Sequence, residues 1–462
     1  MWLDDDAFLA AALSFASDGR DGMSDVAAFP PGRRAGLARL HEFTVGGYAR
    51  GRNFAGERRS VSSLSPYLRH GLVTLVEARD HALATDAARA GKFVQELAWR
   101  EYWRHVLDRR GRGVYDDIEE PKHAHHRAAG LPGELVDGET GLACVDEPLA
   151  ELFETGYMHN HARMWVASAT THLFQRHHAP GAALFAEHLL DHDPASNSLS
   201  WQWVESSFAH RPYLYDRGNV EKWAPGMCAR CPAGQAGRCP FDASYSELGR
   251  RLLGGEREVP PAGDGSYGPP EPEVRGVAEP GLGVGGPIVW LHASSLGAVD
   301  PALAVAPVDA TVAIVIDAPH LQTVPHAAKR LAFIAGSALE TAVDLRAAGR
   351  DVRLAVADPA EALLALDPGS VHVTDEPDPW IRESLARLRT ASAEVVLARR
   401  VLLAPNSAGV PDRTLGRFSR WWKKAQREAY LPPQLSLEVR ISRHCQRQPT
   451  AMKPRWPQPG AS

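Results

Sequence analysis

Four cysteines in this chain have a spacing that suits a metal ion or a cluster. Cys228, Cys231 and Cys239 form the pattern C-x2-C-x7-C, and Cys144 lies upstream in "TGLACVDE". Five cysteines in 462 residues are too few for a disulfide framework, so a close pair indicates metal or redox chemistry. Zinc usually takes a second close pair or finger-spaced histidines. A pair, a third cysteine and a distant fourth suit an iron–sulfur cube instead. Structural zinc and a set without metal stay open as alternatives.

Four other stretches combine acids, amides, arginines and tryptophans. They are "SVSSLSPYLRHG", "FVQELAWREYW", "TGYMHNHARM" and "DHDPASNSLSWQW", in this order along the chain. Taken singly, each fits a helix cap, a core tryptophan or a solvated turn. Their common order and spacing are far more specific than any single short motif.

Together, these stretches resemble the FAD-binding helical domain of the photolyase/cryptochrome family. The resemblance implies a blue-light-driven DNA photolyase, in which reduced FAD splits pyrimidine dimers in ultraviolet-damaged DNA by electron transfer. A cryptochrome-like photoreceptor without repair activity is the alternative. A light-independent redox protein that uses FAD and a cluster is a third possibility.

The resemblance also implies a set of flavin contacts, in which hydroxyl and backbone N–H groups hold the pyrophosphate. Arg163 is expected to pair with Asp191, and the Asn197 amide to lie at the flavin N5 edge. The positions that resemble flavin-binding residues are Tyr48, Arg52, Ser62, Ser63, Leu64, Ser65, Asn160, Arg163, Asp191, Asp193 and Asn197.

Repair chemistry and DNA contact are implied at further positions. Those that resemble catalytic residues are Glu96, Asn160, Met164 and Trp201, and those that resemble DNA contacts are Phe93, Trp99 and Arg100. Asn160, where the iron–sulfur branch of the family has a histidine, favours cyclobutane over (6–4) lesions.

Four positions depart from the family pattern, and one of them is Val61, which replaces a threonine and so loses one hydroxyl contact to the phosphates. Phe93 replaces a stacking tryptophan, His192 replaces a glycine, and His178 replaces the middle tryptophan of the electron-transfer chain. Photoreduction would then need another route, through Trp203 or Trp165.

One bacterial branch of the family carries a [4Fe-4S] cluster behind the FAD domain. Its pattern places one cysteine before the helix of the "MHN" motif, then CxxC, then C-P-F. The chain has matching cysteines in "TGLACVDE", "CARC" and "CPF". The resemblance therefore implies a cluster held by Cys144, Cys228, Cys231 and Cys239.

Bulk charge does not indicate a nucleic-acid partner. The net charge is −5, and residues 1–255 account for it with 28 basic against 33 acidic residues. DNA binding would therefore need a local basic patch, for which we consider Arg100, Arg104, Arg109 and Arg110. No apolar run is long enough for a transmembrane helix and the N-terminus does not resemble a signal peptide, so we expect a cytoplasmic monomer.

The composition along the chain predicts two folded parts. Residues 1–255 are predicted to be an all-helical FAD-binding domain, and 256–287 a Pro/Gly-rich linker. Residues 288–435 are predicted to form a doubly wound parallel α/β domain, and 436–462 a disordered tail. The α/β part resembles the antenna domain that precedes the helical domain in the family, so the chain looks circularly permuted. Its crevice could hold an antenna chromophore of unknown identity.

Hydrophobic periodicity sets the expected elements. Helices are predicted over 33–49, 87–107, 148–175, 325–349, 359–366 and 379–391, and strands over 287–292, 311–317, 351–357, 370–376 and 394–405.

Overall fold

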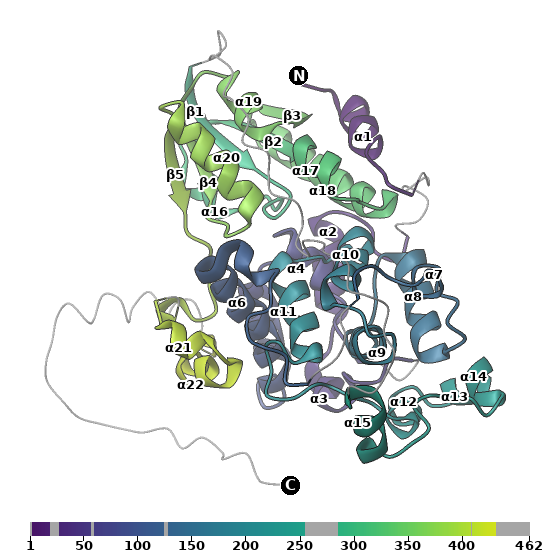
Figure 1. The fold of residues 1–462 in the computed structure, drawn as a ribbon. Helices are drawn as coiled ribbons and strands as arrows, with labels where there is room; N and C mark the ends of the chain where they lie inside the picture. Colours follow the sequence, from purple (N-terminus) through teal and green to yellow (C-terminus); the bar gives the residue numbers. More distant parts are fainter. Residues whose placement is uncertain are drawn as a thin grey trace, which may run out of the picture.

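The computed structural model describes residues 2–18, 27–56, 60–123, 128–254, 285–407 and 409–430. A helical part and an α/β part lie one above the other (Figure 1). The predicted fold class, helical followed by a parallel α/β sheet, is confirmed. The predicted tail and nearly all of the predicted linker lie outside the described residues, and β1 begins at Gly286, inside the last two positions assigned to that linker.

The helical part consists mostly of short helices around one long helix, α6. Its members are α2 (Arg33–Glu42), α3 (Tyr48–Gly51), α4 (Ser65–Arg69), α5 (Leu75–Asp86), α6 (Gly91–Arg110), α7 (Gly133–Val136), α8 (Ala143–Thr155), α9 (Asn160–Ser168), α10 (His178–His188), α11 (Pro194–Glu205), α12 (Arg217–Trp223), α13 (Met227–Arg230), α14 (Pro232–Gln235) and α15 (Tyr245–Leu253).

The helix predicted over 148–175 is interrupted, and the interruption shapes the site. Helix α8 ends at Gly156, which has φ +69° and so a conformation that side chains disfavour. Chain direction then changes before α9, which is capped by the His159 ring accepting from the His161 backbone N–H. The break places Asn160 at the first position of α9. The helix predicted over 33–49 likewise ends at Glu42.

The α/β part is a five-stranded parallel sheet in the order β3-β2-β1-β4-β5. Buried aliphatic runs bounded by turns give the strands, and the helices between them return the chain to the same edge. The elements are β1 (Gly286–Leu291), α16 (Pro301–Val305), β2 (Thr311–Asp317), α17 (Ala318–Thr323), α18 (Ala328–Ala347), β3 (Val352–Ala357), α19 (Pro359–Leu364), β4 (Pro368–Thr374), α20 (Pro379–Thr390) and β5 (Glu394–Ala398).

Both faces of the sheet are buried. Alternate residues of β1 show this, because Trp290 faces a core shared with α19 and α20. Val289 and Leu291 face the opposite way, into a core shared with α16 and α18 that continues into the helical part. The two parts therefore share one hydrophobic core.

The strand predicted over 394–405 is wrong beyond Ala398. Instead of pairing with a neighbouring strand, the backbone N–H groups of Leu403 and Ala404 donate to the Glu101 carboxylate at 2.6 and 3.0 Å. Glu101 lies on α6 and is almost fully buried. A side chain from the helical part thus satisfies the backbone groups that a strand partner would otherwise bind.

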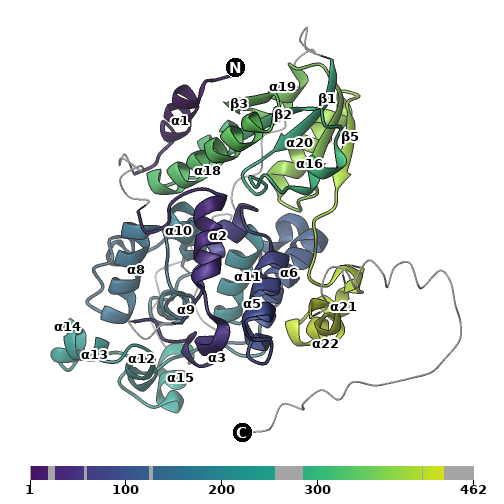
Figure 2. The same cartoon turned by 180° about the vertical axis from the view of Figure 1, so that it is seen from behind.

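The two ends of the described chain cross between the parts. Helix α1 (Asp5–Leu13) packs on α18 and β3 of the α/β part, and Leu3 bridges Leu354. Helices α21 (Asp412–Leu415) and α22 (Phe418–Ala429) follow the sheet in sequence but pack on α6 (Figures 1 and 2). Helix α1, which lies within the range predicted for the helical domain, therefore packs on the α/β part. Helix α22, which lies within the range predicted for the α/β domain, packs on the helical part.

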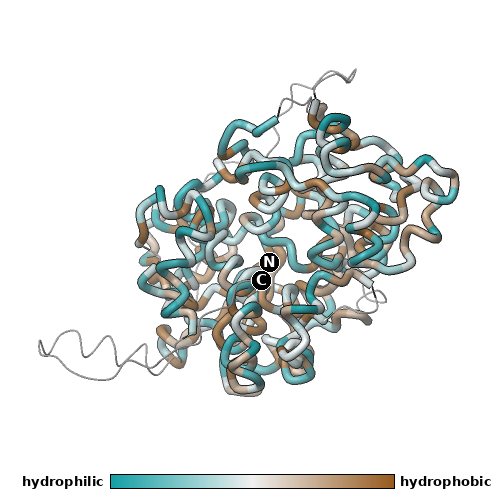
Figure 3. Tube along the Cα trace, turned by 90° about the horizontal axis from the view of Figure 1, so that it is seen from below, coloured by the Kyte–Doolittle hydropathy of each residue, from teal (hydrophilic) through white to brown (hydrophobic). Residues whose placement is uncertain are grey.

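Hydrophobic and hydrophilic residues are interspersed along the helices, as amphipathic packing requires (Figure 3). Within the part of the chain that the structure describes, no helix has both the length and the apolar character to cross a membrane.

Candidate functional site

A cavity of about 410 Å³ lies among α6, α9, α10 and α11 of the helical part. Its wall includes ten of the residues singled out from the sequence. These are Arg52, Glu96, Trp99, Asn160, Arg163, Met164, Asp191, Asp193, Asn197 and Trp201. Residues from four stretches that are well separated in sequence therefore meet at one cavity.

Helix α9 supplies an amide, a cation and a thioether to the cavity. Asn160, Arg163 and Met164 all line it, because positions three and four apart share a helix face. The Arg163 guanidinium donates to Asp191 at 2.8 Å and to the Met158 carbonyl at 2.9 Å. The predicted pairing of Arg163 with the first acid of "DHD" is confirmed.

The second acid of that pair, Asp193, is the N-cap of α11 and accepts from the Ser196 backbone N–H at 2.9 Å. It also accepts from Arg100 at 3.1 Å and Arg104 at 3.4 Å. Burial opposes ionisation, but Arg100, Arg104 and Arg69 outweigh it and hold the pKa of Asp193 far below its usual range. The cavity therefore contains a carboxylate that is ionised at neutral pH.

Asn197 lies one turn further along α11. Its side-chain amide donates to the Ala182 carbonyl on α10 at 2.8 Å. That bond fixes the amide orientation and leaves its oxygen available toward the cavity.

The acidic pair is tied to the α/β part through two arginines. Arg104 contacts Asp193 with one nitrogen and donates with the other to both oxygens of Glu376. Glu376 follows β4, and it also accepts from Arg400. Burial opposes the ionisation of Glu376, yet Arg104 and Arg400 lower its pKa to about 2.

Arg69 makes the second link. It donates to the His192 carbonyl, between the two acids, and to the Ser294 hydroxyl after β1. Sequence reasoning missed these roles of Arg69, Arg104 and Glu376, since the Arg104–Glu376 partners lie 272 positions apart. No local pattern marks such a pair.

Glu96 projects from α6 into the cavity between two cations. Its carboxylate lies 2.6 Å from the Lys92 ammonium and 3.3 Å from the Arg52 guanidinium. Both cations line the same cavity. A carboxylate and two donors are thus available to a polar ligand at this end.

Aromatic rings form much of the remaining wall. Trp99 is stacked on Phe418 of α22, and Trp201 packs edge-on against Phe185 with ring centroids 5.0 Å apart. Trp201 also lies so close to Gly181 that a side chain there would clash with the indole. Trp203 is 37% exposed at the rim. Aromatic rings are therefore available for stacking with a ligand both inside the cavity and at its opening.

Several predicted site residues lie outside the cavity wall. Phe93 and Tyr48 are buried against each other and Phe43, so Phe93 offers no exposed stacking face. Arg100 is directed at Asp193 rather than at solvent. Ser62, Ser63, Leu64 and Ser65 precede or begin α4, where Ser63 has φ +50° and bonds with Tyr157.

His178, at the position of the missing tryptophan, is buried and bonds to Glu205 at 2.9 Å. With His177 and Asp117 it forms a group whose ligand atoms lie within 4.8 Å of one another. His177, however, accepts the Ala179 backbone N–H at Nδ1. Its ring proton is therefore on Nε2, the nitrogen that would have to bind a metal.

The four cysteines line one pocket. Cys144 lies in the first turn of α8, Cys228 lies within α13, Cys231 is the C-cap of α13, and Cys239 follows α14. Tyr215 contacts Cys144, with 3.5 Å between hydroxyl oxygen and Sγ, and the Ala143 N–H donates to Cys231 at 3.4 Å. The fold thus brings the four predicted ligands to one pocket, although Cys144 and Cys239 lie 95 positions apart in the sequence.

The spacing of the sulfurs bears on the choice of metal. Within the described chain, three or more ligand atoms lie within 4.8 Å of one another only in the Asp117–His177–His178 group, so no three of the cysteine sulfurs do. Thiolates on one zinc lie about 3.8 Å apart, from bonds of about 2.3 Å in a tetrahedron. The four sulfurs are therefore more widely spaced than thiolates on a single zinc ion.

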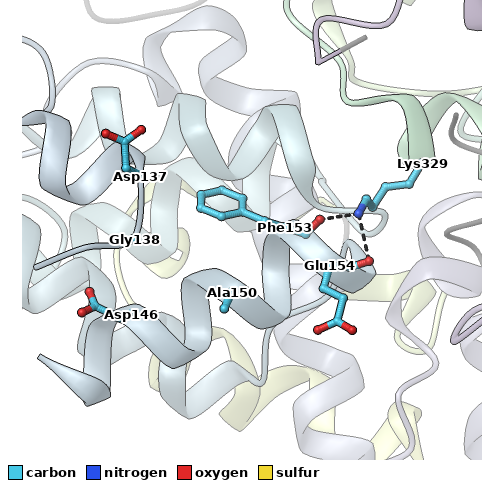
Figure 4. Close-up of a pocket in the computed structure, with 7 residues that line it drawn as sticks. All are labelled: Asp137, Gly138, Asp146, Ala150, Phe153, Glu154 and Lys329. Carbon is cyan, nitrogen blue, oxygen red and sulfur yellow. Dashed lines mark hydrogen bonds between the residues drawn. The ribbon is translucent and has the colours of Figure 1, made fainter. Parts of the chain in front are cut away.

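A second cavity of about 390 Å³ lies where α8 faces the α/β part (Figure 4). Lys329 of α18 enters it and donates to the Phe153 and Glu154 carbonyls at the end of α8. A cation at a helix C-terminus is favourable, so this contact holds the two parts together.

Comparison with known proteins supports an assignment of the helical part. Residues 93–220, which carry most of the cavity wall, match the FAD binding domain of DNA photolyase. The helical part of this chain is therefore similar to the FAD-binding domain of the photolyase/cryptochrome family. The predicted resemblance to this family is thereby confirmed over residues 93–220, which match a FAD-binding domain.

Curated relatives named deoxyribodipyrimidine photo-lyase match part of this chain. The Synechococcus protein is 37% identical over 191 residues, covering 38% of this chain and 39% of the relative. The Escherichia coli protein is 30% identical over 202 residues, covering 40% and 41%. The chain thus spans about two fifths of the length of these relatives.

A solved bacterial class III photolyase from Agrobacterium tumefaciens is 25% identical, with a TM-score of 0.41. That comparison covers 54% of this chain and 55% of the other.

Proposed function

We propose that this protein is a light-driven photolyase that splits pyrimidine dimers in damaged DNA. The observation that carries the proposal is the shared cavity, where Glu96, Trp99, Asn160 and Met164 lie with Asp191, Asp193, Asn197 and Trp201. The first four resemble lesion contacts, and the others resemble flavin and electron-transfer positions. Residues 93–220, which include most of the cavity wall, match the FAD binding domain of DNA photolyase, and relatives named deoxyribodipyrimidine photo-lyase match about two fifths of this chain.

The cavity fits a flavin by its donor set. Arg163 and Asp191 provide a fixed ion pair, and the Asn197 amide is held by Ala182 with its oxygen free. We propose that Arg52, Ser62, Ser63 and Ser65 hold the phosphates and that Asn160, Arg163, Asp191 and Asn197 hold the ring. When bound and reduced, FAD would supply the light-excited electron donor.

The protein's own residues would then orient the lesion and exclude water. Met164 and Trp99 present apolar surfaces, and Asn160 presents an amide between flavin and lesion positions. Glu96, positioned by Lys92 and Arg52, would accept or share a proton at the damaged pyrimidine. Asn160 in place of a histidine favours cyclobutane dimers.

We also propose a [4Fe-4S] cluster held by Cys144, Cys228, Cys231 and Cys239. The wide spacing of the four sulfurs around one pocket supports it. Because the ligands come from α8 and from segments after α12, the cluster would tie these elements together as a structural cofactor. It would contribute folding energy to the edge of the helical part.

The order of the two parts supports a permuted chain. Here the helices of the cavity precede the sheet, whereas in the resembled family the α/β domain comes first. Any antenna chromophore would bind the α/β part, and we propose no identity for it.

The photoreceptor remains the second candidate, favoured by one observation. Phe93 and Arg100, which resemble DNA contacts, are buried among other residues. A repair assay decides between the two. Protein purified and reduced without oxygen is mixed with DNA carrying defined cyclobutane or (6–4) lesions, under blue light or in darkness. Light-dependent restoration supports the photolyase, and its absence with reduced FAD bound supports the photoreceptor.

A further inference from the structure

Helix α22 presents a row of cations to solvent. Arg420, Lys423, Lys424 and Arg427 are all exposed, and their spacing of three, one and three positions places them on one helical face. No acidic residue interrupts that face between Phe418 and Arg427. On a chain of net charge −5, this is a concentrated positive patch.

The opposite face of α22 is already occupied. Phe418, Trp421, Ala425 and Ala429 are buried in the core that α22 shares with α6. Amphipathic basic helices bind lipid surfaces by burying their apolar face. That face is unavailable here, so a partner must be recognised by the cations alone.

These cations are free of carboxylates. Among described residues, Lys423, Lys424 and Arg427 form no ion pair, and Arg420 donates only to the Arg413 carbonyl at 3.3 Å. By contrast, three of the four arginines first considered for DNA binding are already paired. Arg100 and Arg104 contact Asp193, and Arg109 contacts Asp412 at 3.2 Å.

The cationic row is held next to the cavity. Phe418 stacks on the cavity residue Trp99, and Arg417, the N-cap of α22, pairs with Glu119 of the helical part at 2.5 Å. Figures 1 and 2 show α22 at the edge of the molecule, where it contacts α6, α21 and the turn at residues 405–407. A long polyanion could therefore lie along α22 while one of its units enters the cavity.

We propose that α22 binds the phosphate backbone of the DNA strand whose lesion enters the cavity. This inference rests on the proposed function, and it names the part of the protein that supplies affinity for the duplex. Exposed lysines and arginines without carboxylate partners neutralise phosphates at little desolvation cost, and the resulting affinity depends on salt. The cavity itself would then select the lesion.

The test compares a triple variant, Lys423→Gln/Lys424→Gln/Arg427→Gln, with the wild-type chain. Glutamine keeps the helix propensity of these positions. Affinity for a short duplex, with and without one cyclobutane dimer, is measured over a range of salt concentrations. We expect the salt slope to fall by about 2 to 3, because each phosphate contact contributes about 0.9. At about 0.1 M salt, we expect affinity to weaken at least tenfold.

A second triple variant controls for net charge. It replaces three exposed arginines of the α/β part with glutamine, namely Arg346, Arg389 and Arg399. We expect its salt slope to match the wild type. The proposal would be overturned if both triple variants lost DNA affinity equally, or if the α22 variant kept the wild-type salt slope. It would also be overturned if the wild type did not bind DNA. Binding of the wild type to anionic lipid vesicles through the same three residues would overturn it too.

Repair of a dinucleotide dimer separates this inference from the proposed function. That substrate has no flanking phosphates, so the α22 variant should repair it as fast as the wild type at equal FAD content. If the α22 variant failed to repair the dinucleotide dimer, the three cations would be needed to form the cavity itself. That result would overturn the assignment of α22 as a phosphate-binding surface. A wild type that binds duplex through α22 but repairs neither substrate would support the surface while contradicting the photolyase.

Discussion

Trp99 lies flat against Phe418, with ring centroids 3.8 Å apart and an angle of 11° between the ring planes. One ring lines the cavity on α6, and the other belongs to a helix that follows the sheet by sequence. Helix α22, which follows the sheet in sequence, therefore supports the aromatic wall of the cavity from behind Trp99.

Loss of that stack should loosen both α22 and the cavity wall. We expect Phe418→Ala to lower the free energy of unfolding by about 3 to 5 kcal/mol, because a buried phenylalanine leaves a void. Urea denaturation followed by tryptophan fluorescence measures it. Ser419→Ala, exposed on the same helix, is the matched control and should change stability little. Equal stability of Phe418→Ala and wild type would show that α22 does not stay docked on α6.

We expect Glu376 to fix the position of Arg104, and through Arg104 that of the cavity carboxylate Asp193. Replacing it by Gln leaves Arg104 and Arg400 buried with one partner fewer, so we expect a stability loss of about 3 to 5 kcal/mol. Because Arg104 also contacts Asp193, we further expect a shift in the absorption spectrum of bound FAD. Asp375→Asn, in the same loop but partly exposed, is the control. An unshifted flavin spectrum in a destabilised variant would limit Glu376 to a structural role.

The Glu119–Arg417 pair should make the docking of α22 sensitive to acid. Hydrogen bonds from Arg417 lower the pKa of Glu119 from 4.5 to about 2 in the folded protein, against the opposing effect of burial. A lowered pKa stabilises the fold above pH 4.5, and this contribution is lost as pH falls toward 2. Since Glu119 is partly exposed, we expect Glu119→Gln to cost about 1 kcal/mol or less near neutral pH. Denaturation at several pH values should show the two proteins converging in acid, and a constant difference would contradict this.

The cysteine pocket should contain iron. We expect Cys231→Ser to lose iron and the visible absorbance of a cluster, and to yield less folded protein, since ligand binding is linked to folding. Cys445→Ser is the control and should keep full iron, because four other cysteines line the pocket. Elemental analysis of both variants provides the measurement. Stoichiometric zinc in the wild type would instead favour the zinc alternative.

Glu96 should act on the lesion rather than on the cofactor. We expect Glu96→Gln to keep FAD and to lower light-driven repair about 10- to 100-fold, the usual effect of removing a charge-assisted hydrogen bond. Glu120→Gln, exposed and outside the cavity, is the control. FAD content is read from absorbance, and repair from single-turnover flashes. A Glu96→Gln protein without FAD would assign this carboxylate to cofactor binding.

Much of this protein could be predicted from local sequence. Buried aliphatic runs predicted β2 at its observed bounds, residues 311–317, and the resemblance of "TGYMHNHARM" to the family motif assigned Asn160, Arg163 and Met164 to the site that they share. The pairing of Arg163 with Asp191 and the convergence of the cysteines also followed from motif resemblance. Such features depend on residues close in sequence, or on patterns that a family repeats.

Only the tertiary structure decided what the remaining charges and rings do. Arg100 and Arg104 are occupied by Asp193, and Arg104 also by Glu376, a partner 272 positions away. The backbone after β5 binds Glu101 instead of a strand, because α6 lies within reach only once both parts are packed. Ion pairing and stacking depend on distance in space, and packing of the sheet against the helical part sets those distances.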